Sequence, residues 1–178
     1  MKNRKITLPK NSSIRPTTDI VRMAIFSIIY KKIYNAVIFD LFAGSGILGL
    51  EALSRGASFC HFLDIDCRYL KKNITLVSSS KYNIINGDFF RIASKIKQGA
   101  DIIFIDPPYG KYKSKNILET IATNKLIKYN GLIVYEERKD NDIMINSDLF
   151  KIIKERVYGD TKITFIEVQN GYSIPRDI

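Results

Sequence analysis

The chain has 178 residues, of which 46% are hydrophobic and 26% charged, and this composition fits one soluble globular domain with a sizeable core. Its two cysteines, Cys60 and Cys67, exclude a disulfide framework, and they lack metal-ligand spacing with the lone His61. The polar residues after Met1 and the lack of any long apolar run predict neither a signal peptide nor a membrane span. We therefore expect a cytoplasmic protein with reduced thiols, no metal and no membrane contact.

The formal net charge of +10 favours a polyanionic partner such as nucleic acid over a small neutral substrate. The charge is uneven, because Asp19 is the only acidic residue before the first predicted strand. The basic residues in that part of the sequence are Lys2, Arg4, Lys5, Lys10, Arg15, Arg22, Lys31 and Lys32. We predict that residues 1–15 form a basic arm that contacts phosphates, and that residues 16–178 form a single domain.

The pattern of apolar residues predicts an α/β protein. A first helix is expected after Pro16, capped by Thr17 or Thr18, because apolar residues recur at helical spacing from Ile20 to Ile29. Short apolar strands then alternate with helices. The strands are expected at 36–41, 59–64, 82–86, 101–105 and 132–136, and the helices at 48–53, 66–77, 88–97 and 116–123. This alternation indicates a mostly parallel sheet covered on both faces.

Two β-like runs, 150–157 and 162–168, complete the pattern. A Gly159-Asp160 turn joins them, so these two strands must be antiparallel to each other.

The segment AVIFDLFAGSGILGLEALSRGA, residues 36–57, joins the first strand to its helix through a Gly-rich turn. Gly44 and Gly46 let the backbone bend sharply and approach a ligand closely, because they carry no Cβ. The helix that follows points its first N–H groups at whatever lies over the turn. We therefore predict a nucleotide-like ligand here, and its candidate contacts are Asp40, Phe42, Ala43, Gly44, Ser45 and Gly46.

Loops after parallel strands meet at one edge of a sheet, so the strand-end carboxylates should join this turn. The pattern G-x-G-x-x-G at 44–49, followed about 20 residues later by Asp64, fits NAD or S-adenosylmethionine. No residues remain for a separate substrate domain, which favours S-adenosylmethionine. Asp40 would then lie beside the methionine end, Asp64 with Ile65 at the ribose, and Asp88 at the adenine amino group. The alternative for Asp64 or Asp88 is a helix cap.

The four residues Asp106, Pro107, Pro108 and Tyr109 follow the fourth strand and are the most specific signal. Two prolines stiffen the backbone and leave carbonyls free to accept hydrogen bonds. The Asp106 carboxylate and the Pro107 carbonyl can both accept from one exocyclic amino group. Tyr109 supplies a flat face for stacking a base. We assign these four residues to catalysis; the alternative is a strand-ending turn with a core tyrosine.

The motifs DLFAGSGILGLEALSRGA and FIDPPY resemble class I S-adenosylmethionine-dependent methyltransferases that modify exocyclic amino groups. More narrowly, the chain is similar to the RsmD family, bacterial guanine-N2 methyltransferases of small-subunit (16S) ribosomal RNA. RPTTDIVR at 15–22 and YGDT at 158–161 match that family's N-terminal and C-terminal signatures. The resemblance implies a three-layer α/β/α sandwich around a seven-stranded, mostly parallel Rossmann-like sheet with an antiparallel last strand.

The resemblance also implies S-adenosylmethionine as cofactor and ribosomal RNA, or an assembling small subunit, as partner. The sequence shows no obvious exposed heptad or patch, so we expect a monomer. The cofactor residues that the resemblance implies are Asp40, Gly44 and Gly46 at the methionine end, Asp64 at the ribose, and Asp88 and Phe89 at the adenine. The residues that would orient the guanine are Asp106, Pro107 and Tyr109. The candidate RNA contacts are Arg15, Thr18, Arg22, Lys111 and Lys113.

The chain departs from the family pattern in its short arm, since only fourteen residues precede Arg15, and in Met23, Ser27 and Asp64, where Glu, Asn and Glu are usual. Three other functions stay open. An amino-group methyltransferase acting on DNA adenine or cytosine, or on protein glutamine, could use the same loop. A non-catalytic RNA-binding assembly factor could retain the fold, and an NAD oxidoreductase could use the Gly-rich turn.

Overall fold

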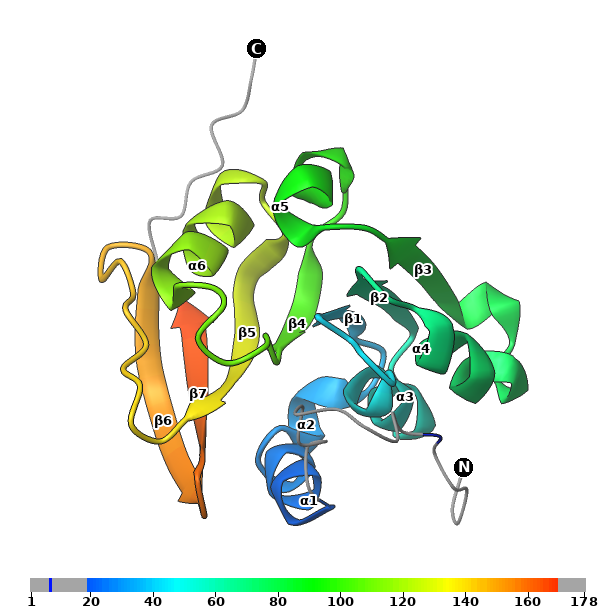
Figure 1. Cartoon of the computed structure of the whole chain (residues 1–178), viewed down its shortest axis with the longest axis horizontal. Helices are drawn as coiled ribbons and strands as arrows, with labels where there is room; N and C mark the ends of the chain where they lie inside the picture. The colour runs from blue at the N-terminus through cyan, green and yellow to red at the C-terminus, as the bar shows by residue number, and fades with distance from the viewer. Residues whose placement is uncertain (1–6, 8–18, 170–178) are drawn as a thin grey trace.

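The computed structural model describes Thr7 and residues 19–169, which form a seven-stranded sheet in the order β3-β2-β1-β4-β5-β7-β6 (Figure 1). The strands are β1 (Val37–Leu41), β2 (Phe59–Asp64), β3 (Tyr82–Asn86), β4 (Ala100–Ile105), β5 (Ile127–Arg138), β6 (Phe150–Tyr158) and β7 (Thr161–Val168). The α-helices are α1 (Asp19–Ile28), α2 (Tyr30–Ile33), α3 (Ile47–Ser54), α4 (Arg68–Asn73), α5 (Phe89–Ile92) and α6 (Ser114–Thr123). Short 3₁₀ turns cover Ile74–Leu76, Ser79–Lys81 and Ala93–Lys95.

The strand pairing brings the predicted site loops together. Strands β1 to β5 are parallel, and β7 runs antiparallel to both β5 and β6. Leu41 at the end of β1 pairs with Leu63 of β2 and with Ile105 of β4, while Asp64 pairs with Asn86 of β3. The carboxyl ends of four strands therefore lie at one edge. The predicted mostly parallel sheet with an antiparallel last strand is confirmed.

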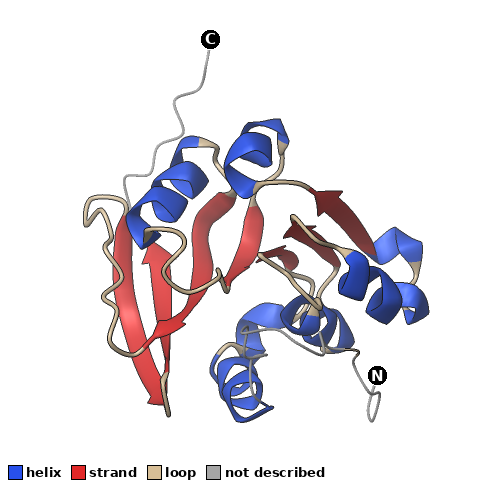
Figure 2. Cartoon of the chain, in the orientation of Figure 1, coloured by secondary structure: helices blue, strands red, loops and turns tan. Residues whose placement is uncertain are grey.

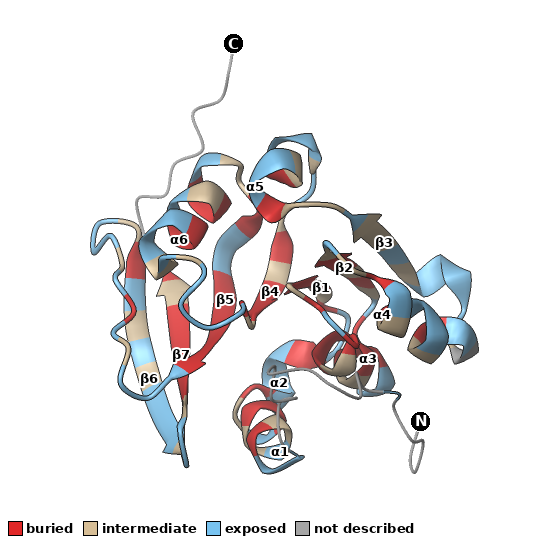
Figure 3. Ribbon diagram, viewed as in Figure 1, coloured by how far each residue is buried: buried red, intermediate tan, exposed pale blue. Residues whose placement is uncertain are grey.

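Helices cover both faces of the sheet and make three layers (Figure 2). The central strand β4 is an unbroken apolar run from Ile102 to Ile105, because both of its faces are buried there. Ile102 and Phe104 pack on the side of α1 to α4, and Ile103 and Ile105 pack on the side of α5 and α6. Figure 3 shows the buried residues concentrated on these central strands. The predicted three-layer α/β/α sandwich is confirmed.

Strand β5 is longer than the predicted 132–136. Its neighbour β7 pairs with it from Leu132, opposite Glu167, to Arg138, opposite Thr161. This antiparallel partner carries the end of the strand past its apolar run, and at the start of the strand Ile127 pairs with Ala100 of β4. Both are long-range effects that the local pattern does not contain.

The helices after β2 and β3 are shorter than the predicted 66–77 and 88–97. Helix α4 ends at Asn73 and α5 at Ile92, and a 3₁₀ turn follows each. The β-branched Ile74 and Thr75 favour helix weakly, and the Asn73 side chain forms its hydrogen bonds outside the helix.

The expected helix cap at Thr17 or Thr18 lies outside the described residues, as does all of the arm except Thr7. Cys60 and Cys67 are buried free thiols, as predicted. Within residues 7 and 19–169, no helix is both long enough and apolar enough to cross a membrane.

Candidate active site

The Gly-rich turn after β1 runs through left-handed backbone at Phe42 (φ 61°), Gly44 (φ 53°) and Gly46 (φ 78°). The Gly46 N–H donates to the Ala43 carbonyl at 2.7 Å and closes the turn. Gly46 also precedes α3 without a side-chain cap. The first N–H groups of α3 therefore face the turn, as the sequence predicts.

Two glycines allow α3 to lie directly on β2. A Cβ on Gly46 would overlap Leu70, and a Cβ on Gly49 would overlap Phe62 and lie 2.6 Å from the Cys60 Sγ. Neither clash can be relieved at a flexible chain end, because the atoms met are buried in the core. The spacing G-x-x-G therefore serves close helix–strand packing as well as the turn.

Asp40 lies on β1 and faces α3 with only 3% of its surface exposed. Its Oδ2 accepts a hydrogen bond from the Gly49 N–H at 2.9 Å. Burial raises the pKa of Asp40 to about 7; the Gly49 N–H opposes this rise and the charge of Asp64 adds to it. The structure thus places a carboxylate of near-neutral pKa under the turn, where a cation would favour its charged form.

Asp64 ends β2 and links two loops. Its Oδ2 accepts from the Gly44 N–H at 2.7 Å, and its Oδ1 accepts from the Asp66 N–H at 2.8 Å. It is therefore not a helix cap, the alternative that the sequence left open. Each oxygen keeps a lone pair for a further donor. The next residue, Ile65, is 66% exposed.

For Asp88 the cap alternative holds in the structure. Asp88 is the N-cap of α5, and its Oδ1 accepts from the Arg91 N–H at 3.3 Å. Phe89 is 2% exposed, and its ring lies 5.6 Å from that of Phe42. The sequence reasoning missed Asn86, whose amide donates to the carbonyls of Asp64 and Ile65 at 3.0 and 2.8 Å.

The Asp-Pro-Pro-Tyr segment follows β4, as predicted. Asp106 is partly exposed, Pro107 is buried and Pro108 is exposed. The Pro108 carbonyl accepts from the Lys111 N–H at 3.1 Å, which folds the loop back. Because β4 pairs with β1, this loop and the Gly-rich turn leave the sheet at the same edge.

Tyr109 is 38% exposed and its hydroxyl is hydrogen-bonded to Thr161, the first residue of β7. Burial raises the pKa of Tyr109 to about 12 against that hydrogen bond, and the negative charges of Glu136, Asp106 and Glu137 add to the rise. The Asp-Pro-Pro-Tyr loop is thus tied to the final hairpin, where the sequence showed the YGDT pattern.

Strand β5 carries two buried acids just before its last residue, and the sequence reasoning missed them. Glu136 is 4% exposed and Glu137 is 5% exposed, and Glu137 accepts from the Arg138 N–H at 2.8 Å. The neighbouring Tyr135 is fully buried, and its hydroxyl has no hydrogen-bond partner among the described residues. Burial, Glu137 and Asp106 all raise the pKa of Tyr135. The signal in the sequence that could have identified Glu136 and Glu137 is a pair of acids directly after an apolar run.

Asn73 connects the arm to the Gly-rich turn, and the sequence did not single it out. Its Oδ1 accepts from the Thr7 N–H at 2.9 Å, and its Nδ2 donates to the Thr7 carbonyl at 3.1 Å. The same Nδ2 donates to the Ser45 carbonyl at 2.9 Å. One amide therefore holds a point of the arm beside the turn.

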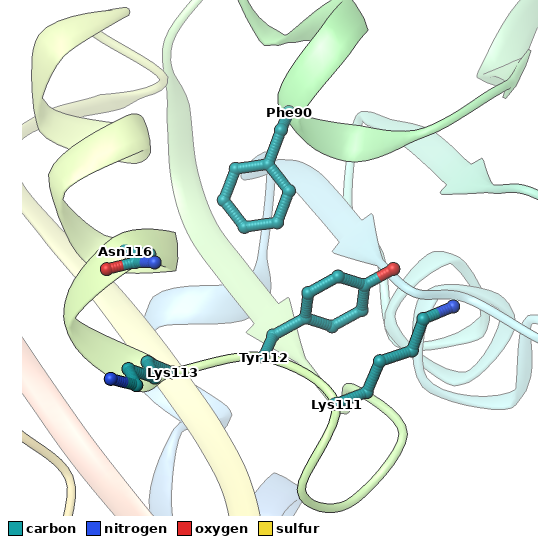
Figure 4. A pocket seen from close by; sticks show the side chains of 5 residues that line it. All are labelled: Phe90, Lys111, Tyr112, Lys113 and Asn116. Atoms are coloured by element: carbon teal, nitrogen blue, oxygen red, sulfur yellow. The ribbon is translucent and has the colours of Figure 1, made fainter.

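The five candidate RNA contacts differ in where they lie and in what they contact. Arg15 and Thr18 lie outside the described residues. Arg22 forms ion pairs with Asp19 at 2.9 Å and Glu51 at 4.0 Å, and its side chain is 21% exposed. Lys111 and Lys113 line an open pocket between α5 and α6 (Figure 4). In the part of the chain that the structure describes, no three His, Cys, Asp or Glu residues cluster as a metal site.

The sequence matches the protein family described as "Conserved hypothetical protein 95" over residues 1–167. "Ribosomal RNA small subunit methyltransferase D" of Buchnera aphidicola (subsp. Acyrthosiphon pisum) is 37% identical over 157 residues, covering 85% of this chain and 82% of that protein. The protein of the same name from Escherichia coli K12 is 29% identical over 161 residues, covering 89% of this chain and 81% of the other.

Solved structures share the fold. The Escherichia coli protein yhhF superposes with a TM-score of 0.80 at 27% identity, covering 93% of this chain and 92% of that chain. SMU.776, solved in complex with SAH, has a TM-score of 0.68 at 16% identity and covers 89% of this chain and 52% of that chain. At 16% identity, the similarity to SMU.776 shows only that the two proteins share a fold.

Proposed function

The chain belongs to the conserved hypothetical protein 95 family, and we propose that it transfers a methyl group from S-adenosylmethionine to the N2 amino group of a guanine in small-subunit ribosomal RNA. The observation that carries the proposal is the Asp106–Tyr109 loop beside the Gly-rich turn, since β4 and β1 end together. The names of the relatives support ribosomal RNA as acceptor. The guanine is supported by the resemblance described above.

The residues at the edge of the sheet fit the cofactor, which supplies an electrophilic methyl group on a sulfonium. Asp40 provides negative charge for the cationic methionine end, and Gly44 and Gly46 let the backbone approach it. Asp64 has lone pairs for the ribose hydroxyls, and the exposed Ile65 offers apolar surface. The remaining contacts in this proposal are Phe42, Ala43 and Ser45 of the turn, and Asp88 and Phe89 near the adenine.

The acceptor amino group is oriented by the loop after β4. The Asp106 carboxylate and the Pro107 carbonyl each accept a hydrogen bond from one of its two N–H groups. The nitrogen lone pair then points at the methyl donor. Tyr109, held at its hydroxyl by Thr161, offers a face to an unstacked base. Orientation supplies most of the rate, and Asp106 stabilises the positive charge that develops on nitrogen before the methylated amine loses its proton.

The protein acts as a monomer in the cytoplasm, on free ribosomal RNA or on an assembling small subunit. The net charge of +10 supports a polyanionic partner. Residues 1–15 serve as the basic arm and residues 16–178 as the catalytic domain, with Arg15, Thr18 and Arg22 near the RNA.

Labelled methyl transfer to small-subunit RNA and to partly assembled subunits, both from cells lacking this protein, tests the proposal. Mass spectrometry then identifies the nucleoside, and N2-methylguanosine at one site is expected. Asp106→Ala and Tyr109→Ala should each lose transfer by about 100-fold or more while still binding S-adenosylhomocysteine. Asp148→Ala, at an exposed carboxylate in the loop before β6, is the matched control.

Other outcomes point to other functions. Near-normal turnover in both variants would refute the assignment of the loop. Transfer to DNA or to a different nucleoside would reassign the acceptor. Binding of S-adenosylhomocysteine without transfer to any acceptor would support a non-catalytic assembly factor. A melting temperature raised by NAD instead of S-adenosylhomocysteine would support an oxidoreductase.

A further inference from the structure

A pocket opens between α5 and the segment that joins β4 to α6 (Figure 4). It has a volume of about 520 Å³ and is lined by Phe90, Lys111, Tyr112, Lys113 and Asn116. This volume falls within the range of small-ligand sites. None of the five residues belongs to the Asp-Pro-Pro-Tyr segment or to the cofactor contacts assigned above.

Two aromatic rings form one side of the pocket. Phe90 is 37% exposed, and its ring lies 5.5 Å from that of Tyr112 at an interplanar angle of 50°. Phe42 and Phe89 support these rings from behind, with centroid distances of 5.4 Å from Phe42 to Tyr112 and 5.1 Å from Phe89 to Phe90. Because the two rings are packed in place, a planar ligand would lose little affinity to ordering them.

The rim of the pocket is positively charged. The Lys111 ammonium lies 5.2 Å from the centroid of the Tyr112 ring, and Lys113 stands just before α6. Neither lysine forms an ion pair with a carboxylate among the described residues. Two unneutralised ammonium groups beside two aromatic faces suit a ligand that combines a flat base with a phosphate.

We propose that this pocket binds a nucleotide of the RNA that flanks the methylated one, with its base against Phe90 and Tyr112, one adjoining phosphate beside Lys111 and the other beside Lys113 on the opposite side of the pocket (Figure 4). The proposal rests on the proposed function and adds a second point of RNA contact to it. Tyr109 and Tyr112 lie on the same loop, so the pocket and the proposed acceptor site share this segment. The cofactor has an adenine but no phosphate, so the lysines favour RNA over it.

The test measures binding directly. In Phe90→Ala, the dissociation constant for small-subunit ribosomal RNA should rise about 5- to 100-fold, while that for S-adenosylhomocysteine stays unchanged. Phe90→Trp should restore RNA binding, because it restores a stacking face. Lys113→Ala should reduce the steepness of the slope of log K for RNA binding against the logarithm of the salt concentration by about one. Tyr129→Ala removes an exposed ring (55%) near the start of β5 and should change neither constant.

Three other outcomes overturn the inference, and one overturns only the proposed function. Unchanged RNA binding in Phe90→Ala would remove the pocket from the RNA path even if the wild-type protein methylates RNA. An equal loss of S-adenosylhomocysteine affinity would assign the pocket to the adenine of the cofactor. If the wild-type protein binds RNA without transferring methyl, the proposed function fails, and the RNA affinity of Phe90→Ala still decides the pocket. A wild-type protein that binds no RNA overturns both.

Discussion

Asp40→Asn should make the protein more stable at alkaline pH while weakening its cofactor site. The Asp40 carboxylate is buried against α3, and burial raises its pKa from 3.8 to about 7. The amide oxygen of an asparagine can still accept the Gly49 N–H, so the substitution removes the buried charge and keeps the hydrogen bond. Stability and function are therefore opposed at this position.

The size of this effect on the free energy of unfolding follows from the linkage between folding and proton binding at Asp40. Below about pH 4 the carboxyl is protonated in the folded and the unfolded chain and contributes no pH dependence. Between pH 4 and pH 7 the unfolded chain ionises first, so the wild-type protein loses stability as pH rises, by about 4 kcal/mol in total for a shift of about three pKa units. Between pH 5 and pH 8 the loss is about 3 kcal/mol, and Asp40→Asn should escape it.

Urea unfolding at pH 5 and pH 8 measures the difference between variant and wild type, which cancels the titration of the other groups. Asp148→Asn, at an exposed carboxylate, controls for the loss of one negative charge. A difference that changes by less than about 0.5 kcal/mol between the two pH values would show that Asp40 is not desolvated as described. The same variant should bind S-adenosylhomocysteine more weakly at pH 8.

Four other substitutions test contacts that set the site. Gly49→Ala should destabilise the fold by about 1–3 kcal/mol in urea unfolding, because its methyl meets the packed face of β2; a loss within error would refute that close packing. Thr161→Val and Tyr109→Phe should each lower kcat about 2- to 10-fold with little change in melting temperature. The double variant should be no worse than either single one, and additive losses would exclude a direct hydrogen bond. Asn73→Asp should weaken binding of S-adenosylhomocysteine, measured calorimetrically, because it leaves the Ser45 carbonyl without its donor; unchanged affinity would disconnect this amide from the site.

The sheet and the position of the site could be predicted from the sequence because their signals are local. Apolar runs mark the strands, and a Gly, Asp or Pro stands at or shortly after the end of each of the first four. Once parallel pairing is assumed, the four loops must meet at one edge, and they do.

Contacts between distant segments could not be predicted in this way. The Asn73 side chain forms hydrogen bonds with the backbone of Thr7, 66 residues away, and no periodic pattern in the sequence predicts this contact. The hydrogen bond between Tyr109 and Thr161 likewise depends on the hairpin lying beside β5. Asp88 was open to two roles because a strand-end Asp caps helices and binds ligands equally well, and only coordinates show the cap.

The contact of α3 with β2 has a consequence for engineering. The floor of the Gly-rich turn rests on Phe62 and Leu70, buried side chains of the core that are not themselves among the proposed cofactor contacts. To admit a cofactor analogue that is enlarged on the side that meets the turn, the turn has to move toward these side chains. We expect the productive library to lie at these two hidden positions, where a smaller side chain lets the helix settle, and not at the glycines, where every addition pushes it out.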